Sequence, residues 1–441
     1  MPKQLIGLFL LAVILAVSMF LITYSFARYQ TIALLSVYTL AFAAYWGIYR
    51  LSKNIQFFWW LMGLAVLLRL ALLPAVPNLS DDVYRFIWDG RLLLQGIDPF
   101  AYLPVEIMEL GIGAKLSGID ENLLRLLNSP EYFTIYPPVN QAIFALAAWL
   151  FPNDVYASTV FIRLWLLMAE VGSLYLMYLL LRQMQLAPHR LLLYALNPLI
   201  LLELTANLHF EALMIFFLLF SFYLLQKQQL PLSALFFALA VCTKLLPLIL
   251  LPLYWRRLGN RKALYFYLLT ALCSILMFLP LLSTELIAGL SQSVGLYFQK
   301  FEFNASIYYI IREIGFVVKG YNIIGSAGRW LAVSTFVAIL LYAVVERKPV
   351  LPAAGMWVWL IYLALATTVH PWYVAPLLAF SVFSSYRFPL LWSWLIFFSY
   401  SGYSAQGFEE VLPLTLLQYA ALAVFIACEI YQRQARPLLP A

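Results

Sequence analysis

The residues best placed to carry chemistry form a short acidic motif that follows an apolar stretch. Asp81 and Asp82 are adjacent, and Arg85 and Asp89 follow at helical spacing. Residues three, four or seven positions apart share a face of a helix, so we expect Asp82, Arg85 and Asp89 on one face. Ser80 is a suitable N-cap for this helix. Because two carboxylates just outside a membrane span can accept a proton or hold a cation, we predict that Asp81 or Asp82 is a catalytic base.

A structural interpretation of the same helix is equally open for two of its members. Val83, Phe86 and Ile87 lie away from the acids, as in a helix that rests on a membrane surface. Arg85 and Asp89 would then form an exposed ion pair without a part in chemistry. The sequence therefore leaves open whether Arg85 binds substrate.

Polar residues inside apolar segments are the second source of candidates, because ionisable groups at membrane depth are costly and are usually functional. Lys244 lies three residues before Pro247, which predicts a break in an apolar helix. Free backbone donors at such a break favour an anion, so we expect Lys244 to contact a phosphate. His209 lies in a polar junction with Glu203 and Glu211. It is either a substrate contact or a buried histidine with satisfied hydrogen bonds.

Residues next to predicted helix ends complete the candidate substrate-binding set. Tyr136 precedes Pro137-Pro138, a pair that suits a helix start, and its hydroxyl either points at the site or serves the fold. His209 and His370 lack the spacing of a zinc motif, so we expect no metal site. The predicted contacts to substrate or lipid phosphate are Arg85, Tyr136, His209, Lys244, Asn304, Arg312, His370 and Tyr373.

The composition determines what kind of protein must position these residues. The chain has 441 residues, of which 64% are hydrophobic and only 11% are charged, whereas soluble domains carry about a quarter charged residues. A continuous basic face for nucleic acid is absent from this sequence. We predict an all-α polytopic membrane protein with about 13 membrane-spanning helices, within a range of about 12 to 15.

The distribution of charge predicts the orientation in the membrane. Basic residues gather in short gaps between apolar segments, which is typical of the cytoplasmic side. These gaps contain Arg50/Lys53, Arg182/Arg190, Arg256/Arg257/Arg261/Lys262, Arg347/Lys348 and Arg433/Arg436. Nine of the 20 acidic residues lie instead within 78–137, with only four basic residues. We predict that 78–137 is an extracytoplasmic loop with short interfacial helices, in a multi-pass protein of the cell membrane.

The same patterns predict five regions. They are three N-terminal spans (1–77), a catalytic loop (78–137), a transmembrane catalytic module (138–282), a second extracytoplasmic loop (283–327) and a C-terminal transmembrane module (328–441). Broken helices are tolerated at membrane depth only where they line a cavity. We expect such a short or broken helix at 138–151 or at 231–255.

The order of the motifs resembles the GT-C superfamily of integral-membrane glycosyltransferases. The motifs are D-D-V-Y at 81–84, G-I-D-P-F at 96–100, Y-P-P at 136–138, N-P-L at 197–199, T-K-L-L-P at 243–247 and H-P-W-Y at 370–373. The resemblance covers about residues 78–375. It is closest to polyprenol-phosphate-mannose-dependent mannosyltransferases, which include the GPI mannosyltransferase I family and bacterial relatives.

This resemblance implies an inverting transfer of a sugar, mannose above all, from a polyprenyl-phosphate donor to a hydroxyl on a glycan or lipid acceptor. Asp81 or Asp82 would deprotonate the acceptor hydroxyl. Cations and donors would stabilise the departing lipid phosphate. The candidates for that role are Lys244, Tyr136, Arg312 and His370. The resemblance implies no cofactor, and we expect no divalent metal.

Two features of the chain depart from the related families. The acidic loop follows the third apolar segment, whereas in typical members it follows the first. Related aminoarabinose transferases carry Glu-Lys before the Pro-Pro pair, where this chain has Ile135-Tyr136. A phosphate contact at that place would therefore be neutral.

Two other classes of function remain open from the sequence. A membrane transporter or lipid flippase would explain the charges inside apolar segments, but not why nearly half of the acids lie in one loop. A polysaccharide polymerase or ligase also has a large outside loop, usually with Arg and His as its key groups. A transporter should tolerate Asp81→Asn and Asp82→Asn, and the enzyme should not.

Overall fold

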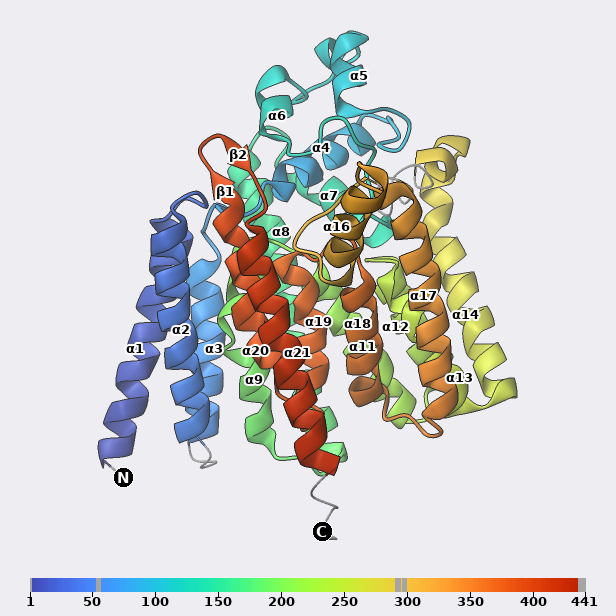
Figure 1. The fold of residues 1–441 in the computed structure, drawn as a ribbon. Helices are drawn as coiled ribbons and strands as arrows, with labels where there is room; N and C mark the ends of the chain where they lie inside the picture. The colour runs from blue at the N-terminus through green and yellow to red at the C-terminus, as the bar shows by residue number, and fades with distance from the viewer. Residues whose placement is uncertain (1, 53–56, 290–294, 296–299, 435–441) are drawn as a thin grey trace.

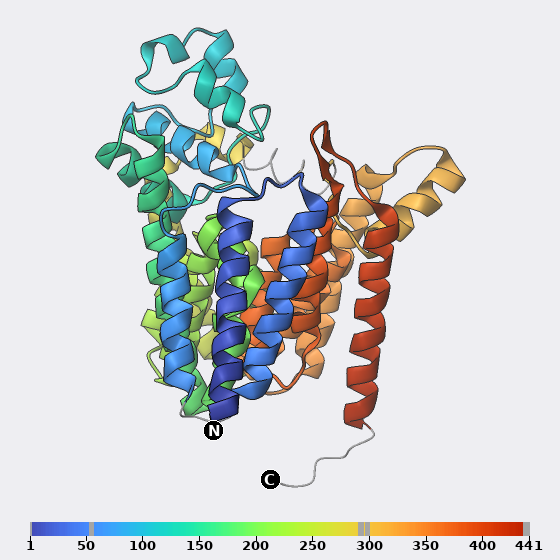
Figure 2. The same cartoon turned by 90° about the vertical axis from the view of Figure 1, so that its left-hand side faces the viewer.

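The computed structural model describes residues 2–52, 57–289, 295 and 300–434, and it is built almost entirely from helices (Figure 1). The chain begins with α1 (Pro2–Tyr24), α2 (Thr31–Leu51) and α3 (Phe58–Leu72). Figure 2 shows these three helices side by side, with α1 and α2 joined at the upper end and α3 running from the lower end to the upper end. The segment that follows α3 therefore starts at the upper end of the molecule.

A cap of short helices covers this upper end, which we call the acidic end because residues 78–137 lie there (Figures 1 and 2). Its elements are α4 (Asp82–Leu94), α5 (Pro104–Glu109), the 3-10 turn η2 (Gly113–Lys115) and α6 (Glu121–Leu126). Helix α7 (Pro138–Leu150) packs against α4. The predicted short helices of the loop and the proline start of the next helix are thus confirmed.

The middle of the chain alternates long helices with broken ones. Its elements are α8 (Val155–Gln183), η3 (Pro188–Leu191), α9 (Leu192–Ala195), α10 (Pro198–Ile200), the π-helix η4 (Leu201–Ala206), α11 (Glu211–Gln226), α12 (Leu230–Val241), η5 (Leu246–Leu250), α13 (Leu251–Leu258), α14 (Asn260–Phe278) and η6 (Leu279–Leu281). Helix α12 ends before Lys244, as the sequence predicts. The segment 231–255 is therefore the broken helix that was expected.

The C-terminal part adds helices around the same core. Its elements are α16 (Ile307–Lys319), α17 (Ile324–Val345), α18 (Leu351–Leu365), η7 (Pro371–Val374), α19 (Ala375–Ser381), α20 (Phe388–Leu395), η8 (Ile396–Gly402), β1 (Tyr403–Ser404), β2 (Gly407–Phe408) and α21 (Leu412–Gln434). The antiparallel pair β1–β2 projects at the acidic end (Figure 1). Within the predicted loop 283–327, residues 290–294 and 296–299 lie outside the described residues.

The helix lengths confirm an all-α polytopic membrane protein. Among the described residues, six helices are long and apolar enough to cross a membrane. The pair Pro198–Ala206 and Glu211–Gln226, bent by 109°, makes a seventh candidate. Other apolar segments are divided into shorter helices, so the expected count of about 13 spans stays a prediction.

Two buried arginines hold the broken part of the fold together. Arg69 of α3 forms an ion pair with Glu170 of α8, and neither side chain is exposed to solvent. Arg163 of α8 donates hydrogen bonds to the backbone oxygens of Thr205 and Ala206, at 2.9 and 3.0 Å. These oxygens belong to the end of the π-helix, where the chain bends. Arg163 therefore donates hydrogen bonds to carbonyl oxygens that a broken helix leaves without backbone partners.

Basic residues concentrate at the lower end of the molecule in Figure 1, which we call the basic end. The last turns of α8, α13 and α21 carry Arg182, Arg256/Arg257 and Arg433 there, and Lys227 is the C-cap residue of α11. Lys53 and Arg436, predicted for the same side, lie outside the described residues. The molecule thus has acids concentrated at one end and basic residues at the other.

Candidate active site

Helix α4 presents the acidic motif and packs tightly against α7. Its N-cap is Asp81 and not the expected Ser80, whose hydroxyl instead accepts a hydrogen bond from the Asp82 N–H at 3.4 Å. Gly90 allows the close approach of the two helices: a Cβ atom there would lie 2.2 Å from the Phe144 backbone oxygen. This contact fixes the position of α4 and of the acids at its start.

The two adjacent acids have different partners. Asp81 forms an ion pair with Arg28 of the α1–α2 loop, with 2.7 Å between nitrogen and oxygen. The groups that bind Asp82 are neutral: the Asn128 amide donates to Oδ1 at 2.7 Å, and the Tyr136 hydroxyl donates to Oδ2 at 3.4 Å. A carboxylate has about four lone-pair sites, so Asp82 retains capacity to accept a proton.

Burial controls the ionisation of the tyrosines around this carboxylate. It raises the pKa of Tyr136 well above that of a free tyrosine, and the nearby charges of Asp82 and Asp89 raise it further. Burial likewise raises the pKa of Tyr403 in β1 to about 12. Both phenols are therefore protonated at neutral pH, and Tyr136 serves as a hydrogen-bond donor to Asp82.

Arg85 and Asp89 form a buried ion pair, 2.8 Å long. Arg85 also donates to the backbone oxygen of Tyr132 at 2.8 Å, and Asp89 accepts hydrogen bonds from Thr134 and Gln141. The exposed surface pair that the sequence allowed is wrong, because the segment before α7 covers α4. Arg85 thus joins α4 to this covering segment.

Two histidines far apart in the chain meet on one tryptophan. The rings of His209 and His370 both stack on Trp372, with 3.7 and 4.4 Å between ring centroids. His209 also lies between two carboxylates: its Nδ1 is 3.9 Å from Asp82 Oδ2, and its Nε2 is 3.4 Å from Glu203 Oε2. His209 therefore sits behind Asp82, on the side of the bent helix.

Lys244 lies at the break after α12 and forms a close ion pair with Glu211. Its ammonium group also lies 5.6 Å from the centroid of the Tyr373 ring. Glu211 is 3% exposed, whereas Lys244 is 24% exposed. The ammonium is thus the accessible member of the pair. Its pairing with Glu211 was not predicted from the sequence.

These side chains line one cavity of about 490 Å³ at the acidic end. Its walls come from α4, the segment before α7, the break after α12, the H-P-W-Y motif and the β1–β2 hairpin. The predicted site residues that line it are Asp81, Asp82, Arg85, Tyr136, Lys244, His370 and Tyr373. His209 contacts the cavity from behind through Asp82 and Trp372.

Asn304 and Arg312 take other positions. The Asn304 backbone N–H donates to Glu410, and its carbonyl accepts a hydrogen bond from the Tyr419 hydroxyl at 2.6 Å. Arg312 forms an ion pair with Glu302, 2.8 Å long, and Glu302 itself lines the cavity. The structure therefore connects Arg312 to the cavity through Glu302, and direct contact of Asn304 or Arg312 with substrate stays a prediction.

Several cavity residues were missed in the sequence. Arg28 is the only charged residue between the first two apolar segments, and an isolated cation on the acidic side was a usable signal. Trp372 lies inside the H-P-W-Y motif, but its role as a platform for two histidines depends on tertiary contacts. Asn128 and Tyr403 carry no periodic or motif signal that would single them out.

The residues around the acids bear on whether a metal binds there. No group of three or more His, Cys, Asp or Glu side chains in the described part of the chain could hold a metal ion. Asp81 contacts a guanidinium, and Asp82 contacts an amide and a phenol. The expected absence of a divalent metal stays a prediction.

Comparison with known proteins assigns the chain to a family. The MptA_B family, described as "alpha-(1->6)-mannopyranosyltransferase, N-terminal domain", matches residues 12–257. The match covers more than half of the chain and includes Asp82, Tyr136 and Lys244. No curated protein matches the chain. The chain therefore belongs to the MptA_B family and is a multi-pass membrane mannosyltransferase.

Proposed function

We propose that this protein is an inverting mannosyltransferase of the GT-C type that uses a polyprenyl-phosphate-linked mannose as donor. The observation that carries the proposal is Asp82, a carboxylate with neutral hydrogen-bond partners that lines the cavity at the acidic end. Such a carboxylate can remove a proton from an acceptor hydroxyl. Asp81 is the weaker candidate, because the Arg28 guanidinium already binds it.

The proposed transfer forms one bond and breaks another within the cavity. The acceptor oxygen attacks the anomeric carbon and forms the new glycosidic bond, while the bond from that carbon to the phosphate oxygen breaks. Asp82 takes the hydroxyl proton, and the bonding electrons leave with the lipid phosphate. A phosphate needs little help from an acid, but it does need cations and donors nearby.

Lys244 is the residue that we assign to the departing phosphate. Its ammonium lines the same cavity as Asp82 and is more exposed than its partner Glu211. His370 and Tyr373 line the cavity beside it and offer polar atoms for the sugar or the phosphate. His209, between Asp82 and Glu203, is a positioning residue for the base.

The family description suggests the identity of the product. An alpha-(1->6)-mannopyranosyltransferase joins mannose to the 6-hydroxyl of its acceptor. Because an inverting reaction exchanges the anomeric configuration, an α product requires a β-linked mannosyl phosphate. We therefore propose a β-mannosyl donor and a mannose-terminated glycan or glycolipid acceptor.

The charge distribution supports a direction across the membrane. Basic residues concentrate on cytoplasmic segments of membrane proteins, so we assign the basic end to the cytoplasm. The cavity with Asp82 then opens on the extracytoplasmic side of the cell membrane. A polyprenyl phosphate would place its hydrocarbon chain in the bilayer and its sugar in the cavity.

Transfer by the purified protein tests this function. We would supply polyprenyl-phosphate β-mannose and a mannose disaccharide, and identify the product linkage and the released polyprenyl phosphate by mass spectrometry and NMR. An α-(1→6)-linked product from the β donor, with none from the α-linked donor, supports the proposal. Turnover of nucleotide-activated mannose alone would overturn the donor assignment, and turnover of the α-linked donor would overturn inversion.

A further inference from the structure

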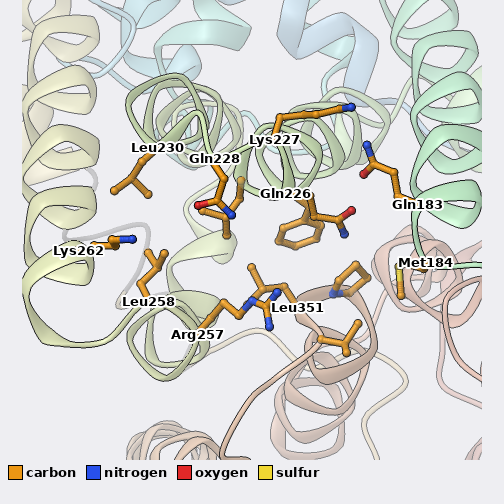
Figure 3. Close-up of a pocket in the computed structure, with 14 residues that line it drawn as sticks. Gln183, Met184, Gln226, Lys227, Gln228, Leu230, Arg257, Leu258, Lys262 and Leu351 are labelled. Atoms are coloured by element: carbon orange, nitrogen blue, oxygen red, sulfur yellow. The ribbon is translucent and has the colours of Figure 1, made fainter.

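A second cavity, of about 990 Å³, opens at the basic end of the molecule (Figure 3). It lies where the ends of α8 and α11, the turn between α13 and α14 and the start of α18 come together. Its polar lining consists of Gln183, Gln226, Lys227, Gln228, Arg257 and Lys262. No lining residue is acidic. The cavity thus offers three cations and three amides to an anion.

The cations in this lining have no carboxylate partner among the residues that the structure describes. All of the ion pairs described there involve other residues. In Figure 3 the Arg257 side chain reaches toward the middle of the cavity, with Lys262 on one side. Because these cations have no carboxylate partner and no acid lines the cavity, the cavity attracts an anion that can balance their positive charge.

The turn that carries two of the cations is held in place. Gly259 has a φ of 74°, a conformation that favours glycine, and it separates α13 from α14. Trp255 Nε1 donates to Asn260 Oδ1 at 2.8 Å, across the same turn. The Tyr267 hydroxyl donates to the Leu251 backbone oxygen at 2.7 Å and holds α14 against α13. Arg257 and Lys262 therefore project from a pre-ordered element.

The neighbouring walls are tied to that turn by buried hydroxyl groups. The Ser221 hydroxyl of α11 donates to the Ser233 backbone oxygen of α12 at 2.9 Å, and Ser233 donates back to the Ser221 oxygen at the same distance. The Tyr254 hydroxyl of α13 lies 2.9 Å from Ser221 Oγ. Three of the elements that form the cavity are thus held together by one polar cluster.

One part of the lining is apolar. Phe222, Leu225 and Leu230 come from α11 and α12, and Leu351 and Pro352 come from the start of α18. A small soluble anion gains nothing from such a wall, whereas a phospholipid places acyl carbons against it. Basic pockets between membrane helices on the cytoplasmic side bind anionic lipid headgroups.

We propose that this cavity binds the phosphate group of an anionic phospholipid, separately from the site at Asp82. Arg257 would hold two phosphate oxygens with its planar guanidinium, and Lys262 would add a second positive charge. The glutamine amides would donate hydrogen bonds to the headgroup. The proposal does not depend on which sugar donor occupies the cavity at the acidic end.

Native mass spectrometry of the full-length protein tests the proposal. The protein would be released from nanodiscs of equal phosphatidylglycerol and phosphatidylcholine, and the retained lipid counted. The test variant is Arg257→Gln with Lys262→Gln. The matched control is Arg261→Gln with Lys348→Gln, which removes equal charge from the same end at residues that do not line the cavity. Glycerol phosphate and inorganic phosphate would be added as competitors in a second arm.

We expect wild type and control to retain phosphatidylglycerol in preference to phosphatidylcholine, and the test variant to lose that preference about tenfold or more. Equal loss in test and control variants, or no preference in wild type, would overturn the proposal. Binding of soluble phosphate at equal affinity, with displacement of the lipid, would replace it by a soluble-anion site. Thermal unfolding and mannosyl transfer by each variant would separate these outcomes from misfolding and from failure of the proposed function.

Discussion

The guanidinium of Arg28 lies 2.7 Å from the carboxylate of Asp81 and joins the α1–α2 loop to the start of α4. This ion pair makes two adjacent acids unlike each other. Asp81 is bound by a cation, whereas Asp82 is bound by the amide of Asn128 and the phenol of Tyr136. The sequence left Asp81 and Asp82 equally open as the base, and because of these different partners we propose Asp82.

Replacement of Lys244 tests its proposed role at the departing phosphate. Lys244→Gln should lower kcat/KM about tenfold to a hundredfold, because a hydrogen bond to a charged group contributes about 1.5–3 kcal/mol. It should also destabilise the fold, because it leaves Glu211 buried without its partner. Initial rates at several donor concentrations and thermal unfolding measure both effects.

A double variant separates these two consequences. Lys244→Gln with Glu211→Gln removes both charges and should recover stability without recovering transfer. Lys115→Gln, an exposed lysine of the same end outside the cavity, is the control for charge alone. Full activity of the double variant would show that Lys244 serves only to neutralise Glu211.

The close contact between α4 and α7 predicts that one added methyl group at Gly90 destabilises the protein. Gly90→Ala would place a Cβ atom 2.2 Å from the Phe144 backbone oxygen, so the helices must separate. We expect a loss of about 1–3 kcal/mol in the free energy of unfolding, with reduced transfer because α4 carries Asp82. Gly63→Ala in α3 meets nothing within 4 Å and is the control. Equal stability of both variants would contradict the tight packing of α4.

The buried ion pair between α3 and α8 predicts a purely structural effect. Glu170→Ala should cost about 3–5 kcal/mol in the free energy of unfolding, because it leaves Arg69 buried and uncompensated. Arg69→Met with Glu170→Met should be much less destabilising, since it removes both charges. Chemical unfolding in detergent measures the difference, and a mild Glu170→Ala effect would show that Arg69 finds another partner.

Part of the site followed from the sequence because local signals set it. The proline pair predicted where α7 begins, and that start brings the Tyr136 hydroxyl within 3.4 Å of Asp82. The break near Lys244 followed from Pro247, which lies in the first turn of η5, after α12 has ended at Val241. In both places one proline determines the backbone, so no tertiary information was needed.

The rest depended on contacts between distant segments. Lys244 finds Glu211 only because α11 starts after a bend of 109°, and the sequence placed Glu211 in a polar junction without predicting its partner. The burial of Arg85 and Asp89 depends on the segment before α7, which covers them. The pattern of polar and apolar residues within α4 cannot reveal that another segment covers these two side chains.

Mannosyl transfer by two single variants tests whether Asp82 is the general base. We would measure the rate of mannosyl transfer from polyprenyl-phosphate β-mannose by Asp82→Asn and Asp81→Asn, with folding of each checked by thermal unfolding. Loss of a general base lowers the rate by about a hundredfold to ten-thousandfold, so Asp82→Asn should show this loss and Asp81→Asn should lose less than about tenfold. A folded Asp82→Asn variant with near wild-type transfer, or a greater loss in Asp81→Asn, would contradict the account.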